Sequence, residues 1–181
     1  MKELYGNSIQ VVKEANAYLV LQCIMRKAPL SVEEIVQTTK LSRPTVINIL
    51  KGLMDDGIVV KDGFAEAAVG RSAALLNLSS SGHLALGIDF EFPKVRMVVA
   101  NMRGEILHSD SFVSSEDIGM EELKSTFYRR VQSFLASTGI PLTQFEGVGV
   151  GIAGVIDSAA GVSLSIERVR DWQNVAICQE L

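Results

Sequence analysis

The chain has 181 residues, of which 48% are hydrophobic, and this is enough for one large domain or two small ones. No apolar run reaches the roughly 18 residues that a membrane span needs, and no signal peptide is apparent, so a soluble cytoplasmic protein is expected. Cys23 and Cys178 stand far apart, which argues against a disulfide framework or a cysteine-rich zinc site.

The net charge of −4 is divided unevenly along the chain. Residues 1–73 carry nine basic and eight acidic side chains, whereas residues 74–181 carry eight and thirteen. The attraction of one copy to nucleic acid phosphates would therefore be modest. DNA binding would need local clustering of charge, or a dimer that contacts two half-sites.

The first predicted element is a helix that Asn7 or Ser8 can cap and that ends before Pro29. Asn16 can instead cap a second segment, so a continuous helix and a broken helix both fit the pattern. The apolar residues expected to pack against the next two helices are Val12, Ala15, Leu19 and Cys23.

Residues 31–57 predict two short helices joined by a tight turn, the pattern of a helix-turn-helix. Ser31 and Glu34 form a capping box in which each side chain can bond a backbone amide at the other residue. The second helix begins at Ser42, a favoured N-cap residue, and tolerates Pro44 in its first turn because amides there have no helical partner.

The second helix presents polar side chains opposite its predicted buried stripe of Val46, Ile49, Leu50 and Leu53. Asn48 and Lys51 fall on the opposite face, Thr45 lies on its flank and Arg43 is expected to be free at the helix start. Arginine and asparagine can read guanine and adenine, while threonine and lysine suit phosphates. The candidate DNA-binding residues are Ser42, Arg43, Thr45, Asn48, Lys51, Lys61 and Arg71.

A solvated helix pair and a protein-interaction module are the alternatives to DNA binding for this segment. Ile47, at the edge of the polar face, favours a protein partner. The polar, amide-bearing and basic residues around it favour DNA.

A wing is predicted directly after the helix-turn-helix, with a strand at residues 58–60, a turn at Lys61–Gly63 and a return strand from Phe64. Gly70-Arg71-Ser72 is interpreted as the link to a second domain, which gives domains of residues 1–72 and 73–181. Arg71 is expected to enter a narrow A·T-rich minor groove, with a solvated linker charge as the alternative.

The second domain is predicted to be half of an α/β fold. Strands at residues 84–90, 95–101 and 105–112 form an antiparallel meander, followed by a helix at residues 120–138, a buried strand at residues 147–152 and a loop at residues 154–161. The residues expected to face inward from the helix are Leu123, Phe127, Val131, Phe134 and Leu135.

This order of motifs resembles the ROK family of bacterial repressors and sugar kinases. The resemblance rests on SVEEIVQTTKLSRPTVINILKGLMDDGIV, on the Gly70-Arg71 link, and on the segments LGIDF and GVGVGIAGVID, all in the family order. It implies a winged helix-turn-helix followed by the first lobe of a ribonuclease-H-like (actin-like ATPase) domain. It also implies a double-stranded DNA operator and, in a full-length form, a sugar or sugar-phosphate effector.

The sequence departs from the family kinases at the positions that their chemistry requires. Where they have Gly-Gly-Thr after the first-strand aspartate, Asp89 is followed by Phe90-Glu91-Phe92, and two aromatics with a carboxylate would repel a polyphosphate. Ile166-Glu167-Arg168 replaces the family's sugar-contacting run before Trp172. Asp89 is accordingly expected to be structural.

The chain also ends before the family's catalytic Asn-Asp pair, its cysteine-rich zinc motif and its Glu-x-Gly-His sugar motif. A non-enzymatic transcriptional regulator, in most members of this type a repressor of sugar-metabolism genes, is therefore expected, without cofactor or metal. A homodimer or higher oligomer is expected, partly because residues 147–156 would lack a covering lobe. A sugar kinase fragment is the alternative within the family.

Overall fold

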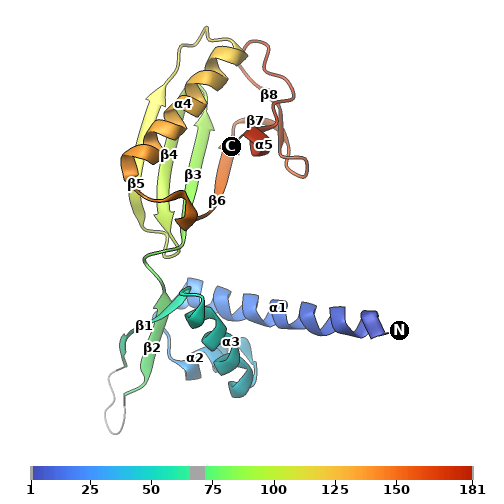
Figure 1. Ribbon diagram of the computed structural model, residues 1–181, viewed down its shortest axis with the longest axis vertical. Helices are drawn as coiled ribbons and strands as arrows, with labels where there is room; N and C mark the ends of the chain where they lie inside the picture. Colours follow the sequence, from blue (N-terminus) through green and yellow to red (C-terminus); the bar gives the residue numbers. More distant parts are fainter. Residues whose placement is uncertain (1, 66–71, 181) are drawn as a thin grey trace. The chain divides into compact units, whose positions relative to one another are not determined.

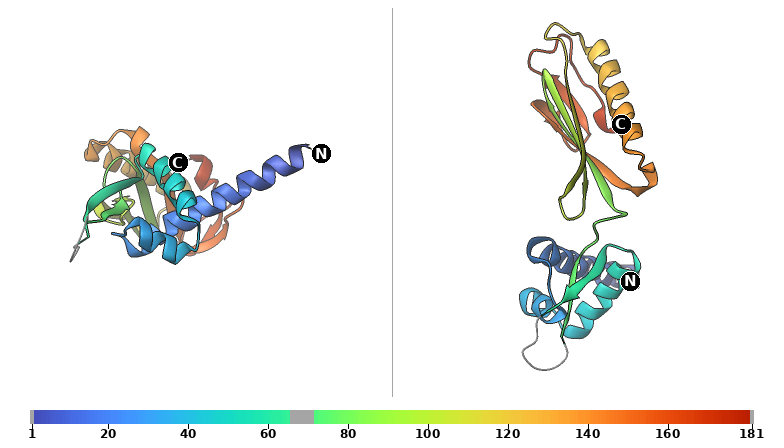
Figure 2. Two further views of the ribbon diagram at one scale, coloured as in Figure 1. Left: turned by 90° about the horizontal axis from the view of Figure 1, so that it is seen from below. Right: turned by 90° about the vertical axis from the view of Figure 1, so that its left-hand side faces the viewer.

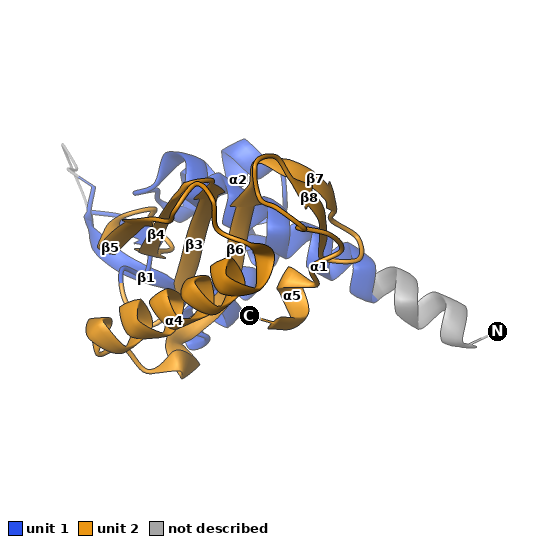
Figure 3. Cartoon of the chain, turned by 90° about the horizontal axis from the view of Figure 1, so that it is seen from above, with its two compact units in different colours: residues 1–80 blue, residues 81–181 orange. Residues whose placement is uncertain are grey.

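The computed structural model describes residues 2–65 and 72–180, with side chains described from residue 10 onward. The chain divides into two compact units, residues 1–80 and residues 81–181, which are coloured separately in Figure 3. No helix in the described part of the chain is long and apolar enough to cross a membrane.

The first unit contains three helices and a two-stranded sheet (Figure 1). Its elements are α1 (Lys2–Lys27), α2 (Val32–Thr39), α3 (Arg43–Asp55), β1 (Val59–Phe64) and β2 (Ala74–Leu78). All five contribute to one core, whose fully buried members include Val20, Ile24, Ile35, Val46 and Val59. This core holds α3 in place on the unit's surface.

α1 is a single helix that runs through Asn16 and begins before the predicted caps at Asn7 and Ser8. Of the four residues predicted to pack, only Cys23 is buried, and the buried face of α1 is formed instead by Val20, Cys23 and Ile24. The prediction was wrong for Val12, Ala15 and Leu19, which are exposed because they lie on the side of α1 that is turned away from Val20 and Ile24.

The wing is present, but its return strand lies later in the sequence than predicted. β1 continues through Lys61–Phe64, and its antiparallel partner is β2, in which Leu78 pairs with Val59. The predicted turn at Lys61–Gly63 was wrong because strand pairing continues to Phe64, opposite Ala74. Since β2 completes the first unit, the units divide between Ser80 and Ser81, not at the expected residue 72.

The second unit is built on a four-stranded sheet of order β5-β4-β3-β6. Its strands are β3 (Leu84–Glu91), β4 (Lys94–Asn101), β5 (Ile106–Val113) and β6 (Phe145–Ile152). β3, β4 and β5 form the predicted antiparallel meander, and β6 pairs with β3 in parallel. The parallel pair needs a crossover, which α4 (Met120–Thr138) and η1 (Leu142–Gln144) supply.

α4 covers one face of this sheet (Figure 2), and the core lies between them. Leu123, Phe127, Val131 and Phe134 are buried as predicted, and the partly buried Leu135 packs beside them. The helix ends at Gly139, whose φ of 68° is a left-handed conformation that favours glycine.

β6 is an edge strand, contrary to the prediction of a buried strand. It pairs with β3 alone among the described strands, and five of its eight residues are exposed. The predicted loop at residues 154–161 contains a second hairpin of β7 (Gly154–Asp157) and β8 (Val162–Ile166), and a short helix, α5 (Ile177–Glu180), follows.

Candidate nucleic-acid interface

Two cap motifs determine where the helices of the helix-turn-helix begin. The Ser31 amide donates to a Glu34 carboxylate oxygen at 2.8 Å, and the Glu34 amide donates to the Ser31 hydroxyl at 3.3 Å, so the predicted capping box is confirmed. These bonds hold the pKa of Glu34 below its usual value, the Ser31 hydroxyl having the larger effect. α2 ends at Lys40 in a left-handed conformation, and α3 begins at its N-cap, Ser42.

α3 buries only part of its predicted apolar stripe and presents polar side chains on its exposed face. Ile49 and Leu53, which were predicted to be buried, are partly exposed and line a groove beside α1. Val46 and Leu50 are buried, whereas Arg43, Asn48 and Lys51 are exposed. Amide and cationic side chains on an exposed helix face are suited to hydrogen bonding with base edges and phosphates. The sequence-based prediction of which face is polar is therefore confirmed.

Arg43 is not free at the start of α3, as had been predicted. Its guanidinium forms an ion pair with the Glu33 carboxylate of α2. The side chains of Arg43 and Glu33 are 57% and 59% exposed, and exposed pairs contribute only about 0–1 kcal/mol to stability. Arg43 can therefore exchange this carboxylate for a ligand at little cost.

Ser42 and Thr45 are engaged with each other at the helix start. Their hydroxyl oxygens lie 2.7 Å apart, and the Ser42 hydroxyl accepts from the Thr45 amide at 3.3 Å. The main role of Ser42 in this structure is thus to cap α3. Thr45 is half-buried and keeps a rim position on the exposed face.

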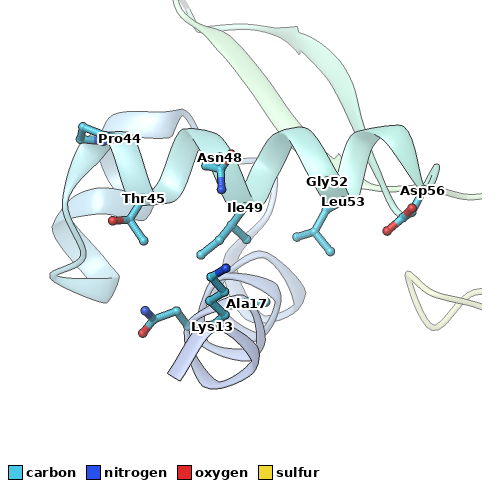
Figure 4. A pocket seen from close by; sticks show the side chains of 10 residues that line it. Lys13, Ala17, Pro44, Thr45, Asn48, Ile49, Gly52, Leu53 and Asp56 are labelled. Carbon is cyan, nitrogen blue, oxygen red and sulfur yellow. The ribbon is translucent and has the colours of Figure 1, made fainter. Parts of the chain in front are cut away.

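A groove of about 600 Å³ lies between α1 and α3, and Asn48 opens into it (Figure 4). Lys13 reaches from α1 toward the side of α3 that carries Asn48, and Thr45 lines the same groove. Lys13 was not among the predicted site residues, because its place beside α3 depends on how α1 packs against α3. The sequence signal that could have identified it is the spacing of four residues between Lys13 and Ala17, which places both on the same face of α1, and Ala17 also lines the groove.

On the other flank of α3, Lys51 and Lys61 line a shallower hollow of about 400 Å³. Lys61 comes from β1, so the hairpin brings a second cation beside the helix. Ile47 is 49% exposed and lines the same hollow. Arg71, the remaining candidate, lies outside the residues that the structure describes.

In the second unit, Asp89 belongs to a cluster of exposed charged side chains. Asp89 and Glu91 both accept hydrogen bonds from the Arg96 guanidinium, at 2.6 Å and 2.9 Å. These bonds, the one to Glu91 first, raise the pKa of Arg96. Phe90 and Phe92 are buried in the core of the second unit, where Phe90 packs against Phe127 of α4, so only Glu91 of the three residues after Asp89 is exposed. Repulsion of a polyphosphate by this segment stays a prediction.

Comparison with known proteins places a helix-turn-helix within the first unit. A family model described as the IclR helix-turn-helix domain matches residues 15–63. The xylose repressor of Bacillus subtilis (strain 168) is 25% identical over 148 residues, covering 81% of this chain and 38% of the repressor. The xylose repressor of Bacillus spizizenii matches to the same extent.

A solved structure described as a ROK family transcriptional regulator, homolog of the E. coli MLC protein, superposes with a TM-score of 0.72. It covers 93% of this chain at 19% identity. This chain has the fold and the order of units of a ROK-family regulator. It spans 42% of the solved ROK regulator and 38% of the Bacillus subtilis repressor, so it corresponds to less than half of each.

Proposed function

We propose that the chain provides the DNA-binding unit and part of the effector domain of a transcriptional repressor that responds to a sugar. The observation that supports this most directly is the exposed polar face of α3, held by a cap at its start and flanked by cations from α1 and β1. The relatives named xylose repressors support a sugar-related role.

Within this proposal, α3 enters the major groove, and the residues on and beside it contact either base edges or phosphates. Asn48 and Arg43 contact base edges, because an amide or a guanidinium can make two hydrogen bonds to one base. Lys51, Lys61 and Lys13 contact phosphates on the two sides of α3, and Thr45 contacts a phosphate at its start. Arg71, beyond the wing, enters an A·T-rich minor groove.

The partners proposed are a double-stranded operator with two-fold symmetry and a second copy of the chain. A regulator that reads two half-sites gains affinity that one modestly charged unit lacks. The sugar is proposed to act through the second unit, residues 81–181, and the chain as a whole spans 42% of the solved ROK regulator.

Selection of bound sequences from random duplexes, followed by affinity measurements on Asn48→Ala and Lys51→Ala, tests the proposal. Asn48→Ala should cost about 1–3 kcal/mol on the selected operator and relax its sequence preference. Lys51→Ala should weaken all duplexes similarly and reduce the salt slope by about one.

If no sequence is enriched, or if Asn48→Ala lowers the affinity for selected and random duplexes equally, base reading by α3 is refuted. Ile47→Ala is the matched control on the same helix, because an apolar side chain of this size cannot supply a hydrogen bond to a base. If Ile47→Ala instead weakens the binding of another protein to the first unit and leaves DNA affinity unchanged, the first unit would be a protein-interaction module.

A further inference from the structure

α1 is longer than its packing within the first unit requires. It has 26 residues, which corresponds to about 39 Å at 1.5 Å per residue. Its buried side chains, Val20, Cys23 and Ile24, all lie in its C-terminal half, whereas residues 10–15 are exposed. The N-terminal part of the helix therefore contributes little to the core of this unit (Figure 1).

A continuous line of exposed or partly exposed, uncharged residues follows α1 on one side. We refer to it as the α1 stripe, which consists of Val11, Val12, Ala15, Tyr18, Leu19, Gln22 and Met25. Val11, Tyr18 and Met25 are 62%, 61% and 59% exposed. Single exposed apolar residues are common, but a row of this length on one helix face marks an interaction surface.

The spacing of the α1 stripe is that of a coiled-coil seam. Val11, Ala15, Tyr18, Gln22 and Met25 follow one another at alternating steps of four and three residues, which keeps them on one line. Val12 and Leu19 flank this line one helical heptad apart. Such a seam fits another helix of the same kind.

The α1 stripe points away from the unit's own core. At 100° per residue, Val20 and Ile24 lie on the side of the helix opposite Val11 and Gln22. Lys13, which faces the groove beside α3, also lies on the core side. A partner on the stripe would therefore leave both the core and the polar face of α3 unchanged.

We propose that the α1 stripe docks against the α1 stripe of a second copy of this chain, with the two helices antiparallel. In the register that we infer, Ala15 lies opposite the partner's Tyr18, and Tyr18 lies opposite the partner's Ala15. Val12 then meets the partner's Leu19. The contact is two-fold symmetric, because the same residues are used on both copies.

Side-chain size selects this arrangement over a parallel one. An antiparallel pair places each large tyrosine against a small alanine, so that the seam fills evenly. A parallel pair in register would place two tyrosines together and two alanines together, which leaves crowding beside a void. The seam residues carry no charge, and the only charged side chains on this side of the described part of α1 are Glu14 and Arg26, whose charges are opposite. A second copy of the same surface therefore suits it better than DNA or an acidic protein would.

Sedimentation equilibrium of the full chain tests whether the α1 stripe mediates self-association. Tyr18→Glu should weaken dimerisation about tenfold or more, because it places a charge in an apolar contact. Leu142→Glu makes a comparable change at a 69% exposed position in the second unit and should leave dimerisation through α1 unchanged. Equal association of Tyr18→Glu and the wild type, or a wild-type monomer at all accessible concentrations, would overturn the proposal.

Disulfide trapping tests the register without relying on a charged variant. In a Cys178→Ser background, Ala15→Cys and Tyr18→Cys chains are mixed under mild oxidation, while the native Cys23 is buried. The mixed dimer should form faster than either homodimer, because a disulfide needs its Cα atoms within about 7 Å. Faster trapping of each variant with itself would show parallel pairing, and no trapping would refute the contact.

This surface rests on the part of the proposed function that names a second copy of the chain, and it specifies where the two copies meet. DNA binding is tested separately, because neither experiment contains DNA. Loss of operator binding in Asn48→Ala together with normal dimerisation would separate the two. Dimerisation without any operator would leave the α1 stripe established and the DNA-binding proposal refuted.

Discussion

The two units differ in how completely their cores are enclosed. In the first unit, residues from α1, α2, α3, β1 and β2 surround one core, and the surface of α3 carries polar side chains. In the second unit, α4 covers one face of the sheet, while Gly147, Gly149 and Gly151 of β6 are exposed on the other.

Because of this difference, the first unit can recognise a ligand through its side chains, whereas the second unit exposes backbone that can pack against another element. The polar groups of α3 can select a ligand, because they are held by a core that needs no further cover. On the exposed face of the second unit, the glycine-rich strand β6 has few side chains with which to select a ligand, and it is suited to close packing against another element. Each unit is expected to unfold in its own transition.

The largest expected effect comes from Phe90→Ala, in the core of the second unit. Phe90 is 1% exposed and packs edge-on against Phe127, with ring centroids 5.3 Å apart. Its loss should lower the unfolding free energy of this unit by about 3–5 kcal/mol. Fluorescence of Trp172, the chain's one tryptophan, reports this transition.

In the same variant, DNA affinity should stay close to that of the wild type. Phe64→Ala, which removes a 71% exposed phenylalanine from β1, is the matched control and should cost little stability. A parallel loss of DNA binding in Phe90→Ala would show that the units are coupled.

The second effect in size is expected for Leu50→Ala, in the core beneath α3. Leu50 is 3% exposed, and removing its side chain should cost about 2–5 kcal/mol in the first unit. Far-UV circular dichroism should show earlier helix loss with unchanged Trp172 fluorescence. If the Trp172 transition shifts by the same amount, the units do not unfold separately.

A smaller effect is expected from Ser31→Ala, which removes the N-cap of α2. The hydroxyl accepts from the Glu34 amide, and N-cap loss typically costs about 1 kcal/mol. Urea unfolding of the first unit measures this change. Ser133→Ala, at an exposed position inside α4, should be nearly neutral, and an equal loss there would refute the assignment to capping.

The smallest effect concerns the pH dependence contributed by Glu34. Its pKa is lowered from 4.5 by the Ser31 hydroxyl and amide, so its stabilising effect is fully present above that value. The effect is lost as the pH falls through the lowered pKa. Glu34→Gln should therefore differ from the wild type near neutral pH and converge with it in acid.

The same titration in Ser31→Ala tests the cause of the lowered Glu34 pKa, because that variant lacks the hydroxyl that lowers it most. Its stability should vary less with pH below 4.5 than that of the wild type. An unchanged acid profile would show that another carboxylate controls this region.

Local signals allowed much of the fold to be predicted from the sequence. The capping box at Ser31, the N-cap at Ser42 and the glycine that ends α4 act within a few residues, so they could be recognised directly. Tertiary pairing was harder. The return strand of the wing was misplaced because the turn chemistry at Lys61–Gly63 resembled a tight hairpin.

For the candidate site, helical periodicity predicted the exposure of Asn48 and Lys51, since that depends on α3 alone. It could not predict the ion pair between Arg43 and Glu33, or the position of Lys13, because both depend on how helices distant in sequence are placed. Periodicity also gave an apolar face for α1 without showing whether this unit or a partner covers it.

The base of the wing has a consequence for how this protein can diversify. Leu30, which precedes α2, exchanges backbone hydrogen bonds of 2.9 Å and 2.7 Å with Leu76 and so holds β2 from its other side. The Ala65 amide donates to the Ala73 carbonyl at 2.8 Å, which joins the two arms of the hairpin beyond the last strand pair. Residues can then be inserted between Ala65 and Ala73 without disturbing the strands. Doubling such a loop costs only about 0.6 kcal/mol in closure entropy, so the tip is a tolerant position for natural or engineered insertions.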